Sequence, residues 1–144
     1  MRIVERMAMA HAGALALMTP ALLGVLGLRR SLILLDLLSR WHPYRHLSVR
    51  RIRAIIRRRL ARPRVMIRRA CLRHGLVLYH FLRLIGLAPR LHLAVYPPSV
   101  DPRRLHGHCW VGLDGKPLLS PPSGPAAEIL TWPTSSNPPS TNPC

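Results

Sequence analysis

Residues 107–119 decide the fold, and they read G-H-C-W-V-G-L-D-G-K-P-L-L. The dipeptide Asp114-Gly115 strongly favours a two-residue hairpin turn, because both residues tolerate the positive φ that such a turn needs. Apolar residues on either side predict two antiparallel strands, over His108–Leu113 and Lys116–Leu119. Upstream, the alternating run R-L-H-L-A-V-Y from Arg90 to Tyr96 predicts another strand. The second half of the chain is therefore expected to form a small antiparallel sheet.

Two helices are expected before this sheet. The first covers Val49–Leu60, where four aliphatic residues recur at helical spacing among arginines: Ile52, Ile55, Ile56 and Leu60. The second begins near Arg68, after the break at Pro63, and ends at Gly86, which suits a helix C-terminus. The sequence thus predicts an α+β fold, with helices at the N-terminus followed by a small antiparallel sheet.

The segment 1–44 is apolar and is expected to be helical. Between Ala8 and Leu28 there is no Asp, Glu, Lys or Arg, and these 21 residues are long enough to cross a bilayer. However, Thr19-Pro20 resembles an N-cap followed by proline, which would split the run into two short helices. We therefore expect a helical pair, either packed or peripheral to a membrane. A true membrane span and a secretory signal are the alternatives, although no small-residue cleavage site precedes Arg29.

The charge of the chain is strongly positive. Its 144 residues hold 22 basic and 5 acidic side chains, a net charge of +17 with neutral histidines. Lys116 is the sole lysine, so the remaining 21 basic residues are arginines, 12 of them between Arg45 and Arg73. Such a surface favours an anionic partner, whether nucleic acid, acidic peptide or phospholipid headgroups. Arg57, Arg58 and Arg59 are candidate docking residues, and a merely solvated helix face is the alternative.

Three segments are expected along the chain. Residues 1–44 form the apolar helices, 45–120 the core with its basic helix, and 121–144 a tail. The tail has 7 prolines in 24 residues and is expected to be mostly disordered, apart from Ala126–Trp132.

Three cysteines without a C-x-x-C motif do not form a disulfide framework, which indicates a reducing compartment.

One set of residues could carry chemistry. Cys71 lies in the first turn of the second predicted helix beside Arg69 and Arg73, where the helix N-terminus and the cations activate a thiol as a nucleophile. His108 on the first hairpin strand would supply the base, and residues 120 and 121 on the returning strand would lie opposite it. A buried structural cysteine is the alternative interpretation of Cys71.

A zinc site is a further alternative for the same region. Cys71, His106, His108 and Cys109 offer ligands of the right type, but neither C-x-x-C nor H-x-x-x-H spacing supports such a site. We therefore expect no bound metal. Cys109 is adjacent to His108 on a strand, so its side chain is expected to face the opposite side and to pack.

Two blocks of the sequence resemble a known family. The first is R-A-C-L-R-H-G-L-V-L-Y-H-F-L-R-L-I-G-L-A-P-R-L-H-L-A-V, from Arg69 to Val95. It resembles the core of the lasso-peptide leader peptidases, which are transglutaminase-like, papain-related cysteine proteases corresponding to the C-terminal part of the lasso peptide biosynthesis B protein. The block Gly107–Leu119 is similar to that family's G-H-[AC]-W-[VL]-x-[VL]-D-G-x-P. The order and spacing of the blocks match the family, and its apolar helical N-terminus is also typical.

The resemblance implies catalytic roles for particular residues. Cys71 would be the nucleophile and His108 the general base. The family's third member is acidic and falls on Ser120, whose hydroxyl can accept a hydrogen bond from the imidazole but carries no charge to stabilise imidazolium. Glu128 is the alternative orienting group. Asp114 is the nearest carboxylate, but its turn position directs it to solvent.

The resemblance also implies a function and partners. The chain would remove the leader from a ribosomally made lasso precursor in the cytoplasm, without a cofactor, before a macrolactam synthetase cyclises the core peptide. Nothing before Arg45 reads as the strands of the family's leader-recognition domain, so a separate recognition protein is expected to present the leader. Nucleic acid has no role in this interpretation. The alternative class is a non-enzymatic arginine-rich protein that binds nucleic acid or an anionic membrane through Arg45–Arg73.

Overall fold

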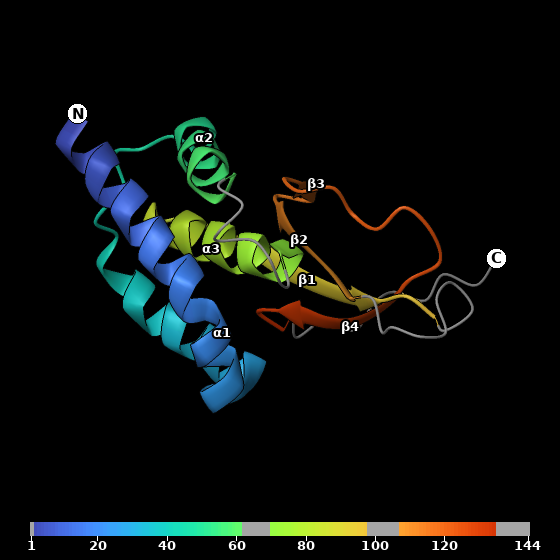
Figure 1. The fold of residues 1–144 in the computed structure, drawn as a ribbon. Coiled ribbons are helices and arrows are strands. Elements are labelled where there is room, and N and C mark those ends of the chain that lie inside the picture. The colour runs from blue at the N-terminus through green and yellow to red at the C-terminus, as the bar shows by residue number, and fades with distance from the viewer. Residues whose placement is uncertain (1, 62–69, 98–106, 135–144) are drawn as a thin grey trace.

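The computed structural model describes residues 2–61, 70–97 and 107–134. Over these ranges the helices gather on one side of the molecule and a small antiparallel sheet on the other (Figure 1). The helical elements are α1 (Arg2–Leu38), the 3-10 turn η1 (Ser39–Trp41), α2 (Val49–Leu60) and α3 (Ala70–Leu84). The strands are β1 (Arg90–Val95), β2 (Gly107–Leu113), β3 (Lys116–Pro117) and β4 (Ala127–Trp132). The predicted α+β class is confirmed.

Helix α1 contains a sharp reversal, so its two halves run back alongside each other (Figure 1). The reversal is at Gly27, whose φ of 75° is readily adopted by glycine alone. The buried Ser31 joins the halves, because its hydroxyl lies 2.7 Å from the Gly27 carbonyl oxygen and 3.3 Å from that of Leu22. A helical pair is therefore present. In the described residues, no helix combines the length and apolar character needed to cross a bilayer.

The predicted break at Thr19-Pro20 was wrong. Thr19 is buried, and its hydroxyl donates to the Leu15 carbonyl at 2.7 Å instead of capping a new helix. Pro20 lies inside the helix, which loses one backbone hydrogen bond there without changing direction. The packing of the two halves, rather than the proline, selects the site of reversal.

Helix α2 matches its prediction in extent and in orientation. The four aliphatic residues expected on its inner face are all buried: Ile52, Ile55, Ile56 and Leu60. Ser48 caps the helix, since its side chain accepts a hydrogen bond from the Arg51 amide. The arginines of the helix are thereby left exposed, except Arg59, which is half-buried.

Helix α3 lies between the other helices and the sheet and forms the centre of the core. Its C-terminus has the hydrogen bonds of a Schellman motif, from the Leu87 amide to the Leu82 carbonyl and from the Gly86 amide to the Arg83 carbonyl. Gly86 has a φ of 89°, as its predicted role at the helix end requires. The predicted start near Arg68 lies outside the described residues.

The four-stranded sheet has the order β3-β2-β1-β4, and every neighbouring pair is antiparallel. The predicted hairpin is present, with Leu113 paired to Lys116 and with positive φ at both Asp114 and Gly115. The returning strand is shorter than the predicted Lys116–Leu119. It stops at Pro117 because the amides of residues 118 and 119 both donate to the Val111 carbonyl, which interrupts the ladder.

Strand β4 lies within the segment predicted as tail and pairs with β1 along the sheet's other edge. It coincides with Ala126–Trp132, the one part of that segment expected to be ordered. The boundary predicted at residue 121 therefore does not mark the end of the sheet. Residues 135–144 lie outside the described residues.

Candidate active site

Cys71 is the second residue of α3 and is partly buried. Its thiol donates to the main-chain oxygen of Gly107, with a sulfur–oxygen distance of 3.6 Å. Gly107 opens β2 and is joined by its peptide group to His108. The start of α3 and the start of β2, which are far apart in sequence, therefore meet at this thiol.

Gly75 allows the helix to approach the strand this closely. A Cβ atom at Gly75, one helical turn after Cys71, would lie 2.5 Å from the sulfur of Cys109. Cys109 is buried between α3 and β2, as the strand alternation predicts. Burial, and then the nearby Cys71, raise the pKa of the Cys109 thiol to about 12, so this second thiol stays protonated at neutral pH.

The imidazole of His108 is held by the segment that follows the hairpin. Its Nε2 lies 2.7 Å from the main-chain oxygen of Ser120. A carbonyl oxygen can only accept, so Nε2 must carry the proton, and Nδ1 is left with a free lone pair. Ser120, the predicted third position, is thus the neighbour of the imidazole, and the acceptor is its carbonyl rather than its hydroxyl. The ring of His108 also stacks on Trp110 with a centroid separation of 6.1 Å.

The thiol of Cys71 and the imidazole of His108 each bond a different main-chain carbonyl. Within the described ranges, no hydrogen bond joins the two groups to each other. Hydrogen bonds between catalytic groups are often long without substrate and tighten when substrate binds. The arrangement places the sulfur at the peptide group adjoining the histidine and leaves Nδ1 available as a proton acceptor.

Glu128, the alternative orienting group, is paired with a different histidine. Its Oε1 lies 2.9 Å from Nδ1 of His92 and also accepts a hydrogen bond from Thr131. Partial burial acts to raise the pKa of Glu128, but the hydrogen bonds from Thr131 and His92 outweigh burial and lower that pKa. The structure therefore gives no support to Glu128 as the orienter of His108.

Sequence reasoning missed the stacked rings beside His108. His92 on β1 is paired with Trp110 on β2, and their rings stack 5.0 Å apart at an angle of 9°. The signal was the period of two in β2, which places His108 and Trp110 on the same face. Trp110 thus supports the imidazole from one side.

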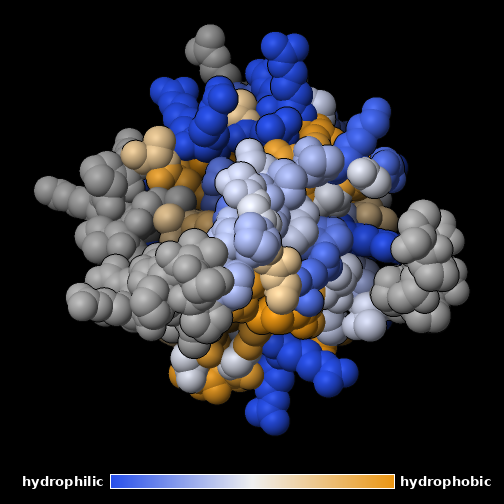
Figure 2. All heavy atoms as spheres, turned by 90° about the vertical axis from the view of Figure 1, so that its right-hand side faces the viewer, coloured by the Kyte–Doolittle hydropathy of each residue, from blue (hydrophilic) through white to orange (hydrophobic). Residues whose placement is uncertain are grey.

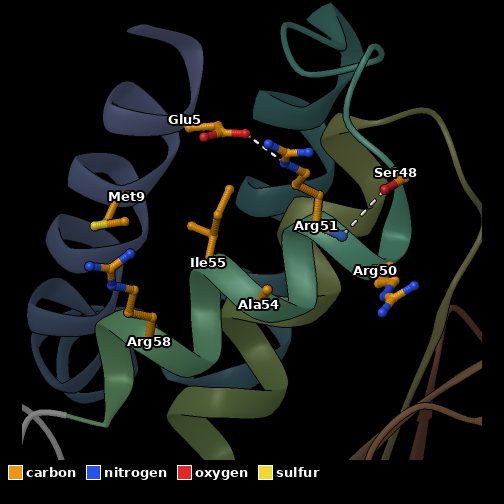
Figure 3. Close-up of a pocket in the computed structure, with 8 residues that line it drawn as sticks. All are labelled: Glu5, Met9, Ser48, Arg50, Arg51, Ala54, Ile55 and Arg58. Atoms are coloured by element: carbon orange, nitrogen blue, oxygen red, sulfur yellow. Dashed lines mark hydrogen bonds and ion pairs between the residues drawn. The ribbon is translucent and has the colours of Figure 1, made fainter. Parts of the chain in front are cut away.

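The three arginines predicted to dock a partner do not share one face of α2. Arg57 lines a groove toward α3, whereas Arg58 lines a cavity between α1 and α2 (Figure 3). Arg59 packs against α1, where a Cβ at Gly13 would come within 2.4 Å of its Nε. Successive helical residues point about 100° apart, so this separation follows from the helix itself.

The described residues contain no group of three or more His, Cys, Asp or Glu side chains placed to hold a metal ion. His106, a member of the zinc set that we considered, lies outside these residues. The sequence prediction that no metal is bound therefore stays a prediction.

Comparison with known proteins identifies the class. The sequence profile of the transglutaminase-like superfamily matches residues 14–128 of the 144, so the chain belongs to that superfamily. The match begins within α1 and reaches into β4, so it crosses the boundaries predicted at residues 45 and 121. No curated protein and no solved structure matches the chain.

Proposed function

We propose that this protein is a cysteine peptidase that removes the leader from a ribosomally synthesised lasso-peptide precursor. The observation that carries the proposal is the meeting of Cys71 at the start of α3 with the Gly107–His108 peptide of β2. The orientation of His108 by the Ser120 carbonyl supports it, because the free Nδ1 suits a general base. Membership of the superfamily agrees with thiol chemistry. The leader-peptidase role rests on the sequence resemblance in the blocks that contain Cys71 and His108.

In the first chemical step, Nδ1 of His108 takes the proton from the Cys71 sulfur. The thiolate then attacks the carbonyl carbon of the scissile bond, and the carbonyl π electrons move to its oxygen. A main-chain or side-chain N–H donor close to Cys71 would stabilise this oxyanion.

The second step breaks the peptide bond. The amine of the core peptide leaves and takes the proton from the His108 imidazolium, while the leader remains on Cys71 as a thioester. Water then attacks the thioester carbonyl and gives a proton to His108, and the Cys71 thiolate departs and is reprotonated. The products are a leader with a free carboxylate and a core peptide with a free amino group, and no cofactor is needed.

The expected partners follow from these products. A macrolactam synthetase would consume the free amine, and a separate recognition protein would present the leader to this chain. Exposed apolar side chains on α1, such as Ile3, Met7 and Val25, suit peripheral contact with a membrane in the cytoplasm.

The test uses the purified protein with the precursor and recognition protein encoded beside it. Mass spectrometry should find two fragments whose masses sum to that of the precursor plus one water. The variant Cys71→Ala should leave the precursor intact with an unchanged circular-dichroism spectrum. The control Cys109→Ala should still cleave, because that buried thiol has no part in the reaction. Cleavage by Cys71→Ala at the native rate would refute the proposal, and tight binding to random DNA without cleavage would favour the non-enzymatic class.

A further inference from the structure

A groove of about 710 Å³ runs between α2 and α3, beside the segment that follows β3. It adjoins the candidate active site at two points. His74 in its wall lies about one helical turn after Cys71, and Leu119 directly precedes Ser120, whose carbonyl holds His108. A ligand in this groove would therefore contact residues that are close in sequence to Cys71 and Ser120.

The groove carries unneutralised positive charge. Arg50, Arg53 and Arg57 line it, and their spacing of three and four residues places them on one face of α2. All three are exposed, and within the described ranges none forms an ion pair with a carboxylate. No acidic residue is among the described residues that line the groove. Figure 2 shows hydrophilic side chains gathered at the end of the molecule that holds α2.

The cavity on the other side of α2 shares Arg50 with the groove and also includes Arg58, but unlike the groove it holds an acidic residue among its described lining. It has a volume of about 450 Å³ and includes Arg51, whose Nε lies 2.6 Å from Oε1 of Glu5 on α1 (Figure 3). The acid that neutralises this arginine comes from the chain itself. Among the described residues that line the α2–α3 groove there is no such acid, so the groove is complementary to a ligand that carries carboxylates.

The lining of the groove favours a peptide over a nucleic acid. Leu78 and Leu119 contribute an aliphatic surface, and the described lining contains no Phe, Tyr or Trp on which a base would stack. Burial, and then the charge of Arg53, lower the pKa of His74, so its imidazole is a neutral hydrogen-bonding group at neutral pH. The volume is in the range of sites that take ligands of a few residues.

We propose that the α2–α3 groove binds an acidic, partly apolar segment of the peptide substrate next to the scissile bond, with Arg53 and Arg57 pairing with its carboxylates. The identity of that peptide as substrate rests on the proposed function. The binding itself does not, because it can be measured with a protein that cannot cleave.

The experiment measures binding to the full-length Cys71→Ala protein by fluorescence anisotropy. The probes are two labelled peptides, one alternating Glu with Leu and Ala, and the other with Gln in place of every Glu. The Glu peptide should bind about tenfold more tightly than the Gln peptide, and the further changes Arg53→Gln and Arg57→Gln should weaken it by roughly tenfold. The matched control is Arg45→Gln with Arg58→Gln, which removes the same charge outside the groove and should change the affinity by less than about threefold.

Each other outcome contradicts part of the proposal. Equal losses in the two double variants would show that net charge, rather than the groove, attracts the peptide. Tighter binding of a random-sequence DNA duplex or of phosphatidylglycerol vesicles, lost on changing Arg53 and Arg57, would assign the groove to that partner instead. If the Glu peptide binds as expected but the wild-type protein cleaves no precursor, the groove stands and the proposed function fails. If the variant without Arg53 and Arg57 cleaves the precursor as well as the wild type at substrate concentrations below saturation, the proposed peptidase function is supported. Binding of the substrate by the groove is then contradicted.

Discussion

The two ends of α3 are held in different ways. At its start, the candidate catalytic groups Cys71 and His108 are bonded to main-chain carbonyls of Gly107 and Ser120. At its other end, side chains form the contacts. His80 is buried, and its Nδ1 donates to the hydroxyl of Ser39 at 3.0 Å, because that hydroxyl already donates to the Leu35 carbonyl.

A second contact at the buried end joins three elements. The hydroxyl of Tyr79 donates to Asp36 at 2.7 Å, and the indole nitrogen of Trp132 donates to the other carboxylate oxygen at 2.8 Å. Burial, and then the hydrogen bond to Asp36, raise the pKa of Tyr79, so the phenol remains a donor. Side-chain pairs thus anchor one end of the helix, whereas the candidate catalytic groups at the other end are bonded to main-chain carbonyls, which every residue has. Changes at the buried end should alter stability, and changes at the start should alter activity.

The largest expected effect on stability is at Asp36. Asp36→Ala should lower the free energy of unfolding by about 3 kcal/mol, because it leaves the Tyr79 hydroxyl and the Trp132 indole without an acceptor and removes a partner of Arg83. The matched control is Glu5→Ala, which removes the exposed ion pair with Arg51 and should cost less than about 1 kcal/mol. Urea unfolding measures both. Equal losses would contradict the distinction between a carboxylate with three partners and one with a single ion pair.

The second effect is a loss of stability in acid. Burial is the main cause that lowers the pKa of His80 to about 4, from the ordinary 6.5. Below pH 6.5 the His80 imidazole is protonated in the unfolded chain but remains neutral in the folded chain. The free energy of unfolding therefore falls as the pH drops and stops falling near pH 4. This difference corresponds to roughly 3 kcal/mol.

Urea unfolding at several pH values tests this expectation, with His80→Gln as the comparison. The variant is expected to be less stable at pH 7 but to lose less stability on acidification. His11, whose pKa is also lowered by burial, remains in both proteins. The same slope with pH in both proteins would show that His80 is not the group responsible.

A smaller effect is expected at Gly75, where α3 approaches β2. Gly75→Ala should cost about 1–2 kcal/mol, because its new methyl group would overlap the Cys109 sulfur. Adding Cys109→Ala removes that sulfur and should restore most of the loss. Thermal unfolding of the two single variants and the double variant gives the coupling energy. Additive losses would mean that the close approach of α3 to β2 at this point is not what requires glycine.

The smallest effect concerns Ser120. The acceptor for His108 is the carbonyl, which alanine keeps, so Ser120→Ala should change kcat/KM for precursor cleavage by less than about twofold. A loss near tenfold would show that the hydroxyl orients the imidazole instead. The exposed Thr134→Ala, distant in sequence from the site, is the control.

Much of this fold could be predicted because its signals are local. The aliphatic residues of α2, the turn at Asp114 and the helix end at Gly86 each depend on neighbours within one or two turns. The position of the reversal in α1 could not be predicted from the sequence, because Pro20 is a stronger local signal for a helix break than Gly27. The choice between the two positions depends on how the two halves of α1 pack.

The sequence proposed the residues of the candidate site but not their hydrogen bonds. Cys71 contacts the carbonyl of Gly107, the residue before His108, and His108 contacts the carbonyl of Ser120. Neither carbonyl has a signature in the sequence, because every residue has one. The partners of Asp36 lie far away in the chain, on α3 and β4, so no spacing could reveal them. Because a main-chain carbonyl has no sequence signature, the prediction assigned the orienting role to the hydroxyl of Ser120.

The most direct test labels the thiols of Cys71 and Cys109 with iodoacetamide at neutral pH and compares their rates of alkylation. Mass spectrometry of the labelled peptides measures both rates. Cys71 should be alkylated at least about tenfold faster than Cys109, and His108→Ala should slow Cys71 by roughly tenfold or more without changing the thermal unfolding midpoint. Alkylation of Cys71 at an unchanged rate in His108→Ala would contradict the claim that these two residues act together at the start of α3.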